Sequence, residues 1–596
     1  MISLNTYVSP SYTYALIPTG WYPAAVAVSA DGSALFVANA KNVPGPNPQN
    51  CKSIIGVGAD SDPACNAANQ YVYKLEKGGM LTVPAPTDRS TLDALTAQVA
   101  QNNNFTPSAN HDQNIAIMAQ VRAKIQHVIY IVKENRTYDQ ILGDLPKGNG
   151  DPSIVVFGNA YTPNQHQIAS QFVTLDNFYD SGEVSGVGWN WSTAGRATDY
   201  VEKTVPPSYA NRFGPIFYEY EGTNRNINLS VPDLASRQKL LPIPLLNDPN
   251  LLPGVRDVAA PDSSEGAVGA GYLWDAALRH GLSIRNYGFY LDLIRYQLPS
   301  PFTSVNIQPS TTPFTSGIVQ AIPANAALAP YTDPYFRGFD NAWPDFYRYQ
   351  EWAREFDQYV SAANLPALSF VRFMHDHTGN FDTAQFGVNT PEIQIADNDY
   401  AVGLLLEKLS KSPYAANTLV FVIEDDAQDG PDHVDAHRSI AFVAGPYVKQ
   451  GALVSTRYNT VNFVRTIKDV LGIPYFGITD GTAEPMADLF DMPQTSWTYS
   501  SLVPAILRTT LPLPAKTQNN SLPDSKGNRS ARKPLHDAKW WARKMSGQDF
   551  DKEDDLDTES YNHVLWQGIM GKKPYPEIRG GADLRENREQ LLKNLR

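Results

Sequence analysis

The sequence predicts an α/β fold with a central, mostly parallel sheet that is flanked by helices. From about residue 120 onward, apolar runs of strand length alternate with longer helical or irregular segments, which is the pattern of βαβ units around a parallel sheet. The apolar share of the 596 residues, 42%, is ample for a packed core. A small β-rich segment is expected before this region and a helical C-terminal extension after it. The predicted domains are residues 1–110, 111–510 and 511–596, with a long insertion at about 200–345.

Residues 1–110 carry the signs of a β-hairpin and a helix. Two short alternating runs, Ala25 to Val28 and Ala34 to Val37, flank a turn at Ser29 to Gly32, a spacing typical of a hairpin. A further strand is predicted at Gln70 to Leu75, at the end of a loop-like segment. A helix is predicted at Thr91 to Ala100.

Residues 111–510 contain the predicted elements of the main sheet. Strands are expected at His127–Val132, Phe172–Leu175, Ala367–Phe373, Leu419–Ile423 and Ile440–Ala444, and helices at Gly271–His280, Tyr347–Ala362, Asp397–Ser410 and Thr460–Leu471. The region of about 200–345, rich in Pro, Asn and Tyr, is expected to form long insertions over one face. A linker after residue 510 leads to a helical tail, in which Trp540, Trp541 and Trp566 are predicted to be packing anchors.

The charge balance excludes one broad class of function. The chain has 48 Lys and Arg against 61 Asp and Glu, a net charge of −13, whereas affinity for nucleic acids rests on basic residues that neutralise phosphates. We therefore expect no nucleic-acid partner. No stretch approaches the ~20 apolar residues that span a bilayer, so no transmembrane segment is expected either. The oligomeric state is left open.

The two cysteines bear on the compartment. Cys51 and Cys65 lie in one polar, Gly-rich segment and are the only cysteines of the chain. A local disulfide made in an oxidising compartment is favoured over two unpaired thiols. The first residues lack the basic and apolar regions of an export signal. Together with the Lys-poor composition, the cysteine pair indicates a periplasmic or secreted protein whose signal is not present in the given sequence.

Polar side chains follow three of the predicted strands at the point where each strand ends. They are Lys133-Glu134-Asn135, His375-Asp376-His377 and Glu424-Asp425-Asp426, with His433 and His437 shortly after the last run. Ligands of open parallel sheets bind at the carboxyl ends of the strands, so these groups are expected to meet. Crowded carboxylates stay ionised when a cation lies among them, and such oxygens suit a hard or borderline divalent ion. Each motif alone is better explained as a helix N-cap, but the three together favour a metal site.

Three motifs resemble a known family of enzymes. ENRTYD at 134–139, FVTLDNFYDSGEVS at 172–185 and EDDAQDGPDHVDAHRS at 424–439 are similar to motifs of a bacterial phosphoesterase family. That family includes phospholipases C and acid phosphatases and belongs to the alkaline-phosphatase superfamily. The likeness covers roughly residues 120–490 and implies an alkaline-phosphatase-like fold. Residues 14–40 also resemble one blade of a YVTN-type β-propeller, although no second copy occurs at the ~40-residue period of such repeats.

The resemblance implies a metal site and a nucleophile. Its metal ligands correspond to Glu134, Asn135, Asp425 and Asp426, which would hold one firm divalent ion, with Ca, Mn or Mg favoured over Zn. The nucleophile corresponds to Ser185. Ser181, Ser192 and Thr137 are rival hydroxyl groups, and Thr137 is better explained as a helix cap or turn residue.

The resemblance also implies catalytic imidazoles. His437 corresponds to a histidine that precedes an apolar strand and a Gly-Pro pair, and His433 is a further candidate catalytic group. Asp376 and His377 follow the middle strand, with a spacing that departs from the usual second-metal motif of the superfamily. We therefore expect these side chains either to contact the phosphoryl group or to hold a weaker second ion.

The segment after Ser185 departs from the family pattern. Relatives have a small residue, an acidic residue, Gly and His before Asn-Trp, whereas this chain has Gly186-Val187-Gly188-Trp189-Asn190-Trp191. Val187, Trp189 and Asn190 are accordingly predicted to contact the substrate, and a bulky or hydrophobic ester becomes favoured over a small sugar phosphate. The alternative is that Val187 and Trp189 only repack this loop.

These observations predict a metal-dependent hydrolase of small-molecule or lipid phosphate esters that forms a phosphoseryl intermediate. Metal coordination lowers the pKa of a serine hydroxyl, which can then attack phosphorus. Phosphotriesters, phosphonates and sulfate esters are expected as side substrates. A sulfatase proper is disfavoured, because the C/S-x-P-x-R signature of those enzymes has no match. The alternative from another class is a catalytically degenerate binding or scaffold protein of the same fold.

Overall fold

The structure is a computed structural model that divides into two compact units. It describes residues 2–3, 12–20, 23–40, 78–103, 105, 108–182, 184–198, 201, 271–291, 308–321, 323, 325, 327–428, 430–512, 533–548, 550, 556 and 558–576. The N-terminal unit comprises Met1–Asp112, Thr482–Glu484 and Arg579–Arg596, and the main unit comprises Gln113–Gly481 and Pro485–Ile578. Cys51, Cys65, the predicted strand Gln70–Leu75 and most of the predicted insertion lie outside the described residues.

The N-terminal unit contains a three-stranded antiparallel sheet. Its strands are β3 (Pro23–Val28), β4 (Ala34–Asn39) and β5 (Gly79–Pro84), in the order β3-β4-β5. The turn between β3 and β4 is closed by Asp31, whose Oδ1 accepts hydrogen bonds from the Ser29 hydroxyl (2.6 Å) and the Ser33 amide (3.1 Å). The predicted hairpin is thereby confirmed, whereas a propeller origin stays a prediction. The unit also contains helix α2 (Arg89–Asn102) and the short pair β1 (Ile2–Ser3) and β2 (Tyr12–Thr13).

The main unit is built around a five-stranded sheet with the order β12-β11-β6-β10-β9. The strands are β6 (His127–Lys133), β9 (Ile284–Tyr287), β10 (Leu368–Arg372), β11 (Thr418–Glu424) and β12 (Ala441–Ala444). Only β12 runs antiparallel to its neighbour. The predicted mostly parallel sheet is therefore confirmed. Strand β9 was not predicted.

The register aligns the carboxyl ends of the three central strands. Ile131 of β6 pairs with Val371 of β10 on one side and with Val422 of β11 on the other. One residue before the end of β6, Val132 lies beside Arg372, and Lys133 lies beside Glu424. The three following loops therefore leave the sheet at the same level, which places their polar residues at one edge.

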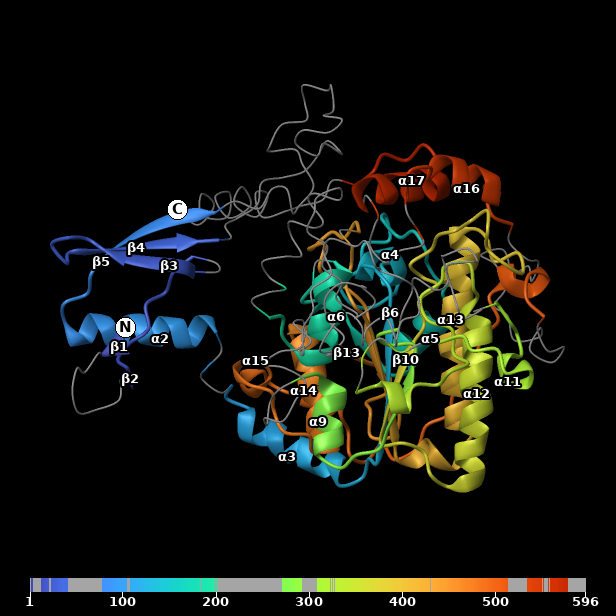
Figure 1. The fold of residues 1–596 in the computed structure, drawn as a ribbon, viewed down its shortest axis with the longest axis horizontal. Helices are drawn as coiled ribbons and strands as arrows, with labels where there is room; N and C mark the ends of the chain where they lie inside the picture. Colours follow the sequence, from blue (N-terminus) through green and yellow to red (C-terminus); the bar gives the residue numbers. More distant parts are fainter. Residues whose placement is uncertain are drawn as a thin grey trace, which may run out of the picture. The chain divides into compact units, whose positions relative to one another are not determined.

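Helices cover both faces of this sheet (Figure 1). Helices α6 (Ser185–Ala194), α9 (Leu273–Arg279) and α14 (Thr460–Leu471) lie on one side, and α5 (Pro163–Gln171), α12 (Asp345–Ala362) and α13 (Pro391–Ser410) lie on the other. The bounds of α14 agree with the prediction, and α13 begins six residues earlier than Asp397. The early start follows from Pro391, which has the fixed φ angle that favours the first turn of a helix.

The main unit is completed by two short parallel strand pairs and the C-terminal helices. β7 (Val173–Leu175) pairs with β13 (Ala452–Val454), and β8 (Phe178–Tyr179) pairs with β14 (Tyr458–Asn459). The C-terminal helices are α16 (Ala538–Lys544) and α17 (Thr558–Met570). Trp541 and Trp566 are buried, as expected for packing anchors. No helix among the described residues has the length and apolar character needed to cross a membrane.

Candidate metal and ester-binding site

The loop after β6 places Asn135 at the edge of the sheet. Asn135 has a φ of 69°, in the left-handed region that Asn enters more readily than most residues. The turn is followed by helix α4 (Tyr138–Leu142), where the Thr137 hydroxyl accepts a hydrogen bond from the Gln140 amide. Thr137 is therefore the N-cap of α4, as predicted, which removes it as a rival nucleophile.

Four side chains from distant parts of the sequence meet at this edge, and we call them the oxygen cluster: Asn135, Ser185, Asp425 and Asp426. The Ser185 hydroxyl lies 2.7 Å from Asp426 Oδ2 and 3.5 Å from Asn135 Oδ1. One branch of the Asn135 amide lies 3.0 Å from Asp425 Oδ1 and 3.1 Å from Asp426 Oδ2. All four residues are buried. The structure thus brings together a predicted nucleophile and three of the predicted metal ligands.

The donor set of the oxygen cluster fits a hard divalent cation. With its NH2 group on the branch facing the two aspartates, Asn135 donates to both carboxylates, and its oxygen accepts from Gln428 Nε2 at 3.0 Å. With its oxygen on that branch, Asn135 presents a third oxygen to two buried carboxylates, an arrangement that a bound cation would stabilise. The spacing of about 3 Å between these oxygens is also that of neighbouring ligands around an ion with ~2.1 Å bonds. The residues present could therefore hold Mg²⁺ or Mn²⁺.

Ser185 reaches the oxygen cluster because the backbone of helix α6 lies unusually close to the backbone of Asp425 and of Gly182. A Cβ atom on Gly188 would lie 2.4 Å from the carbonyl oxygen of Asp425, and one on Gly182 would lie 2.5 Å from the Cα of Gly188. Gly182 also forms a parallel bridge with Asp426. Ser185 is the first residue of α6, so its side chain lies at the positive end of the helix dipole, where an anion is stabilised.

Glu134, another predicted ligand, is paired with an arginine that sequence reasoning missed. Its Oε1 accepts hydrogen bonds from Arg372 Nε, at 3.0 Å, and from Arg372 Nη2. The guanidinium lies over the ring of Trp189 at 4.5 Å and over that of Phe339 at 5.1 Å. Arg372 neutralises the charge of Glu134. This carboxylate therefore lies at the edge of the site as a member of an ion pair. Its role as a metal ligand stays a prediction.

Asp376 lies in a buried ion-pair group rather than in the oxygen cluster. Lys133 Nζ lies 2.6 Å from Asp376 Oδ2 and 2.7 Å from Glu424 Oε1. Asp376 Oδ1 accepts hydrogen bonds from the Glu134 amide and from Asn398, each at 3.2 Å. Burial alone would lower the pKa of Lys133, but the two carboxylates outweigh it and raise that pKa. Both oxygens of Asp376 are thus engaged within the protein, which differs from the expected role as a ligand of a second ion.

His377 is a buried imidazole beside two guanidinium groups. Neither ring nitrogen has a hydrogen-bond partner in the described part of the chain. Burial, together with the charges of Arg136 and Arg372, lowers the pKa of His377 to about 3. The ring packs edge-on against Phe339 at 5.1 Å. A neutral imidazole in this position can donate or accept one hydrogen bond but does not start as a charged acid.

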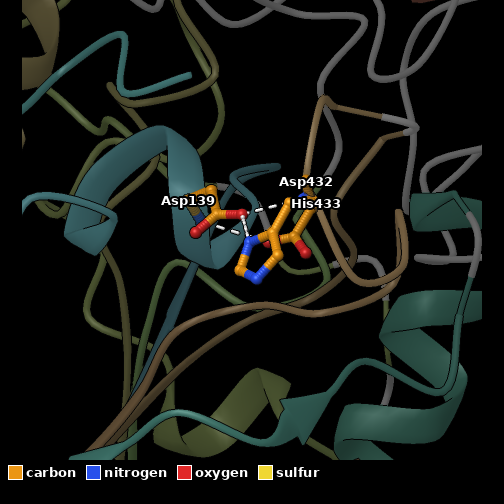
Figure 2. A group of neighbouring side chains, drawn as sticks. All are labelled: Asp139, Asp432 and His433. Atoms are coloured by element: carbon orange, nitrogen blue, oxygen red, sulfur yellow. Dashed lines mark hydrogen bonds and ion pairs between the residues drawn. The ribbon is translucent and has the colours of Figure 1, made fainter. Parts of the chain in front are cut away.

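His433 lies in a separate network, which we call the Asp139 network: Asp139, Asp432, His433 and Arg438. His433 Nδ1 lies 2.6 Å from Asp139 Oδ2, and Figure 2 shows this ring nitrogen turned toward Asp139. The Arg438 guanidinium lies 2.9 Å from Asp139 Oδ1 and 3.0 Å from Asp432 Oδ1. Asp139, Asp432 and His433 lie close enough to one another to hold an ion. However, Arg438 already supplies the positive charge between the two carboxylates.

His437 is the most exposed of the predicted catalytic groups. Its Nδ1 lies 2.7 Å from Asp435 Oδ1, and its side chain is 35% exposed. Its carbonyl oxygen accepts a hydrogen bond from the amide of Asp180 at 2.8 Å. Among the described residues, no hydrogen bond links His433 or His437 to Ser185. The structure therefore does not place these two imidazoles at the nucleophile.

The residues expected to contact the substrate are buried in helix α6. Trp189 and Asn190 have no exposed surface, and Val187 is 7% exposed. The Trp189 ring packs edge-on against Phe289, with 4.8 Å between centroids. The segment was interpreted as a loop, whereas it forms helix α6 despite the low helix propensity of its two glycines. Its packing on the sheet and on the Asp425 backbone overrides that propensity.

Comparison with known proteins gives one family match. The sequence profile of the Phosphoesterase family matches residues 323–474, a segment that includes Asp376, His377, Asp425 and Asp426 but neither Asn135 nor Ser185. This match indicates an ester hydrolase. No curated protein sequence matches the chain significantly.

Solved structures that resemble the chain do so at low identity. One is a protein of the alkaline phosphatase superfamily from Vibrio parahaemolyticus, with 15% identity and a TM-score of 0.34, covering 63% of this chain and 81% of that one. Another is a sulfatase from Pseudoalteromonas sp., with 11% identity, a TM-score of 0.38, and coverage of 65% and 77%. The lipoteichoic acid synthase LtaP from Listeria monocytogenes has 12% identity, a TM-score of 0.34, and coverage of 64% and 81%.

Proposed function

We propose that this ester hydrolase is a metal-dependent phosphoesterase that uses Ser185 as its nucleophile. The observation that carries the proposal is the hydrogen bond of 2.7 Å between the Ser185 hydroxyl and Asp426, within a cluster of oxygens contributed by Asn135, Asp425 and Asp426. A phosphate ester is preferred over a sulfate ester for two reasons: the Phosphoesterase match, and the absence from the sequence of the formylglycine signature.

The residues of the cluster suit attack on a tetrahedral ester. Asp426 accepts the hydrogen bond of the Ser185 hydroxyl, which orients the oxygen and gives its proton a path to a carboxylate. As the Oγ–P bond forms, the bond from phosphorus to the leaving oxygen breaks, and that oxygen takes a proton from solvent. The N-terminus of α6 stabilises the negative charge that develops beside Ser185. Water then hydrolyses the phosphoserine and restores the hydroxyl group.

A divalent ion bound by Asn135, Asp425 and Asp426 would lower the pKa of the serine hydroxyl and polarise the ester. The chain's own residues otherwise provide position and exclusion of water, since each member of the cluster is buried. His377 is suited to hydrogen-bond a phosphoryl oxygen as a neutral imidazole, because burial keeps its pKa low.

The test is hydrolysis of a panel of nitrophenyl phosphate monoesters, diesters and sulfates by the full-length protein, with and without a chelator. We expect Ser185→Ala to lower kcat for the best substrate by at least about 10³-fold, the order seen when a catalytic nucleophile is removed. Ser192→Ala is the matched control, because Ser192 lies in the same helix and its hydroxyl donates to the Trp189 carbonyl, at 3.2 Å, rather than to a member of the oxygen cluster. Turnover indifferent to chelation and to Ser185→Ala would refute the proposal, whereas a protein that turns over no ester of the panel would favour the degenerate binding protein.

A further inference from the structure

Helix α17 crosses the end of the sheet from which the site loops emerge (Figure 1). Its residue Tyr561 is fully buried. The Tyr561 hydroxyl donates to the carbonyl oxygen of His377 at 2.8 Å and accepts from Arg136 Nη2 at 2.9 Å. The same hydroxyl bonds the Thr378 hydroxyl. One phenol group thus joins the loop after β6 to the loop after β10.

The next residue of α17 contacts the third loop. Asn562 Nδ2 donates to the carbonyl oxygen of Gln428 at 3.0 Å. The Gln428 amide in turn donates to Asp426 Oδ1 at 2.6 Å, and its side chain faces the Asn135 amide at 3.0 Å. Only Gln428 therefore separates Asn562 from two members of the oxygen cluster.

Two of the residues that α17 contacts have strained backbones. Thr378 has a φ of 57° and Gln428 a φ of 46°. Neither residue is Gly or Asn, and the left-handed region is especially unfavourable for a β-branched residue such as Thr. Such conformations persist only where the surrounding structure holds them. At both positions, a side chain of α17 forms a hydrogen bond with the strained residue.

We propose that Tyr561 and Asn562 are positioning residues, which hold the Thr378 and Gln428 loops in the left-handed conformations that assemble the candidate metal site. The part of this inference that concerns metal binding rests on the proposed function. It makes α17 part of the catalytic apparatus, although the helix lies more than 130 residues after Asp426 in the sequence. Neither residue touches Ser185, so their effect is transmitted through Gln428 and through the His377 loop.

The experiment compares three variants of the full-length protein: Asn562→Leu, Tyr561→Phe and Trp566→Phe. Trp566→Phe is the matched control, because Trp566 is a buried residue of the same helix and its Nε1 donates to the Lys573 carbonyl, at 2.8 Å, rather than to a site loop. Mn²⁺ affinity is measured by EPR titration, thermal stability by calorimetry, and amide protection of residues 376–380 and 426–430 by hydrogen exchange.

We expect Asn562→Leu to weaken Mn²⁺ binding by about 10-fold, the lower end of the effect of outer-shell partners, and to lose protection at 426–430. Tyr561→Phe should lose protection at 376–380 and lower kcat more than it raises KM. Trp566→Phe should lower thermal stability while leaving Mn²⁺ affinity and both segments unchanged. Variants that lose only stability, to the same extent as the control, would overturn the inference.

A wild-type protein that neither binds Mn²⁺ nor hydrolyses the ester panel would refute the proposed function instead. In that case hydrogen exchange still decides whether α17 holds the two loops. Unchanged protection in Asn562→Leu and Tyr561→Phe would then refute the inference on its own.

Discussion

The oxygen cluster and the Asp139 network are both rich in carboxylates, yet they differ in how their charge is balanced. In the Asp139 network, the Arg438 guanidinium lies between Asp139 and Asp432, at 2.9 and 3.0 Å. In the oxygen cluster, two adjacent buried carboxylates face a serine hydroxyl and an amide. The network contains its own cation, whereas the cluster has the donor set that we propose for a divalent ion.

This difference shows why counting acidic residues is a poor guide to metal sites. Both groups combine residues that follow β6 with residues that follow β11, and both contain two aspartates. The Asp139 network also contains an arginine between its carboxylates, and a buried carboxylate is stable only when its charge is compensated or when it takes up a proton. Variants that remove carboxylates or the arginine test this explanation directly.

The largest expected effect is on metal binding by the oxygen cluster. Asp425→Asn and Asp426→Asn should each weaken Mn²⁺ binding by more than about 100-fold. Mutation of a residue that only contacts a metal ligand already lowers metal affinity by ~10–100-fold. Asp432→Asn should leave Mn²⁺ affinity within a factor of about 3, because Arg438 and not an ion compensates Asp432. EPR titration of the three variants measures this contrast. Equal losses in all three would mean that the two groups form one metal-binding system.

A second prediction concerns a variant without Arg438, the cation of the Asp139 network. Arg438→Gln leaves Asp139 and Asp432 buried without their partner, and breaking a buried pair in this way costs about 3–5 kcal/mol of the free energy of unfolding. Arg457→Gln is the control, since Arg457 is exposed and lies over the Tyr179 ring, at 5.0 Å. Urea unfolding measures the loss.

If charge compensation explains the comparison, millimolar Mn²⁺ should restore part of the stability of Arg438→Gln. The same ion should give Arg457→Gln no more stabilisation than it gives the wild-type protein. A variant whose stability is unaffected by Mn²⁺ would show that geometry, and not charge alone, prevents the network from binding an ion.

The smallest expected effect is the pH dependence of protein stability that arises from Asp432 in the Asp139 network. Burial raises the pKa of Asp432 from 3.8 to about 6, and the neighbouring Arg438 only partly opposes this. The folded state therefore binds this proton more tightly than the unfolded state does, so the contribution of Asp432 to stability is largest below pH 4. It is lost as the pH rises toward 6. Thermal melts between pH 4 and 7 should show a shallower decline for Asp432→Asn than for the wild-type protein, and an unchanged slope would contradict this assignment.

The strongly apolar elements of the fold could be predicted from the sequence. β6 and β11 are uninterrupted apolar runs, and α14 combines an Asn N-cap with a glycine at its end, so local signals agree with the final structure. β9 and α6 could not be predicted in this way. The four residues of β9 carry two polar side chains, and α6 is stabilised by packing that Gly182 and Gly188 permit.

The candidate site was predictable where strand ends determined it, and Ser185 was predicted from the family resemblance. Asn135, Asp425 and Asp426 directly follow strands, and their meeting follows from the parallel register. The partners of the other polar residues depend on tertiary contacts without a local signal: Lys133 for Asp376, Arg438 for Asp432 and Asp435 for His437. The role of Arg372 and the contacts of α17 were missed for the same reason.

The left-handed backbone of Asn135 has a practical consequence for mutagenesis. Alanine at this position would combine two losses, that of the amide and that of a residue type that tolerates a φ of 69°. Glycine adopts this conformation freely, so Asn135→Gly deletes the side chain while sparing the turn. Comparing glycine with alanine at position 135 therefore separates what the carboxamide does for chemistry from what it does for the shape of the main chain.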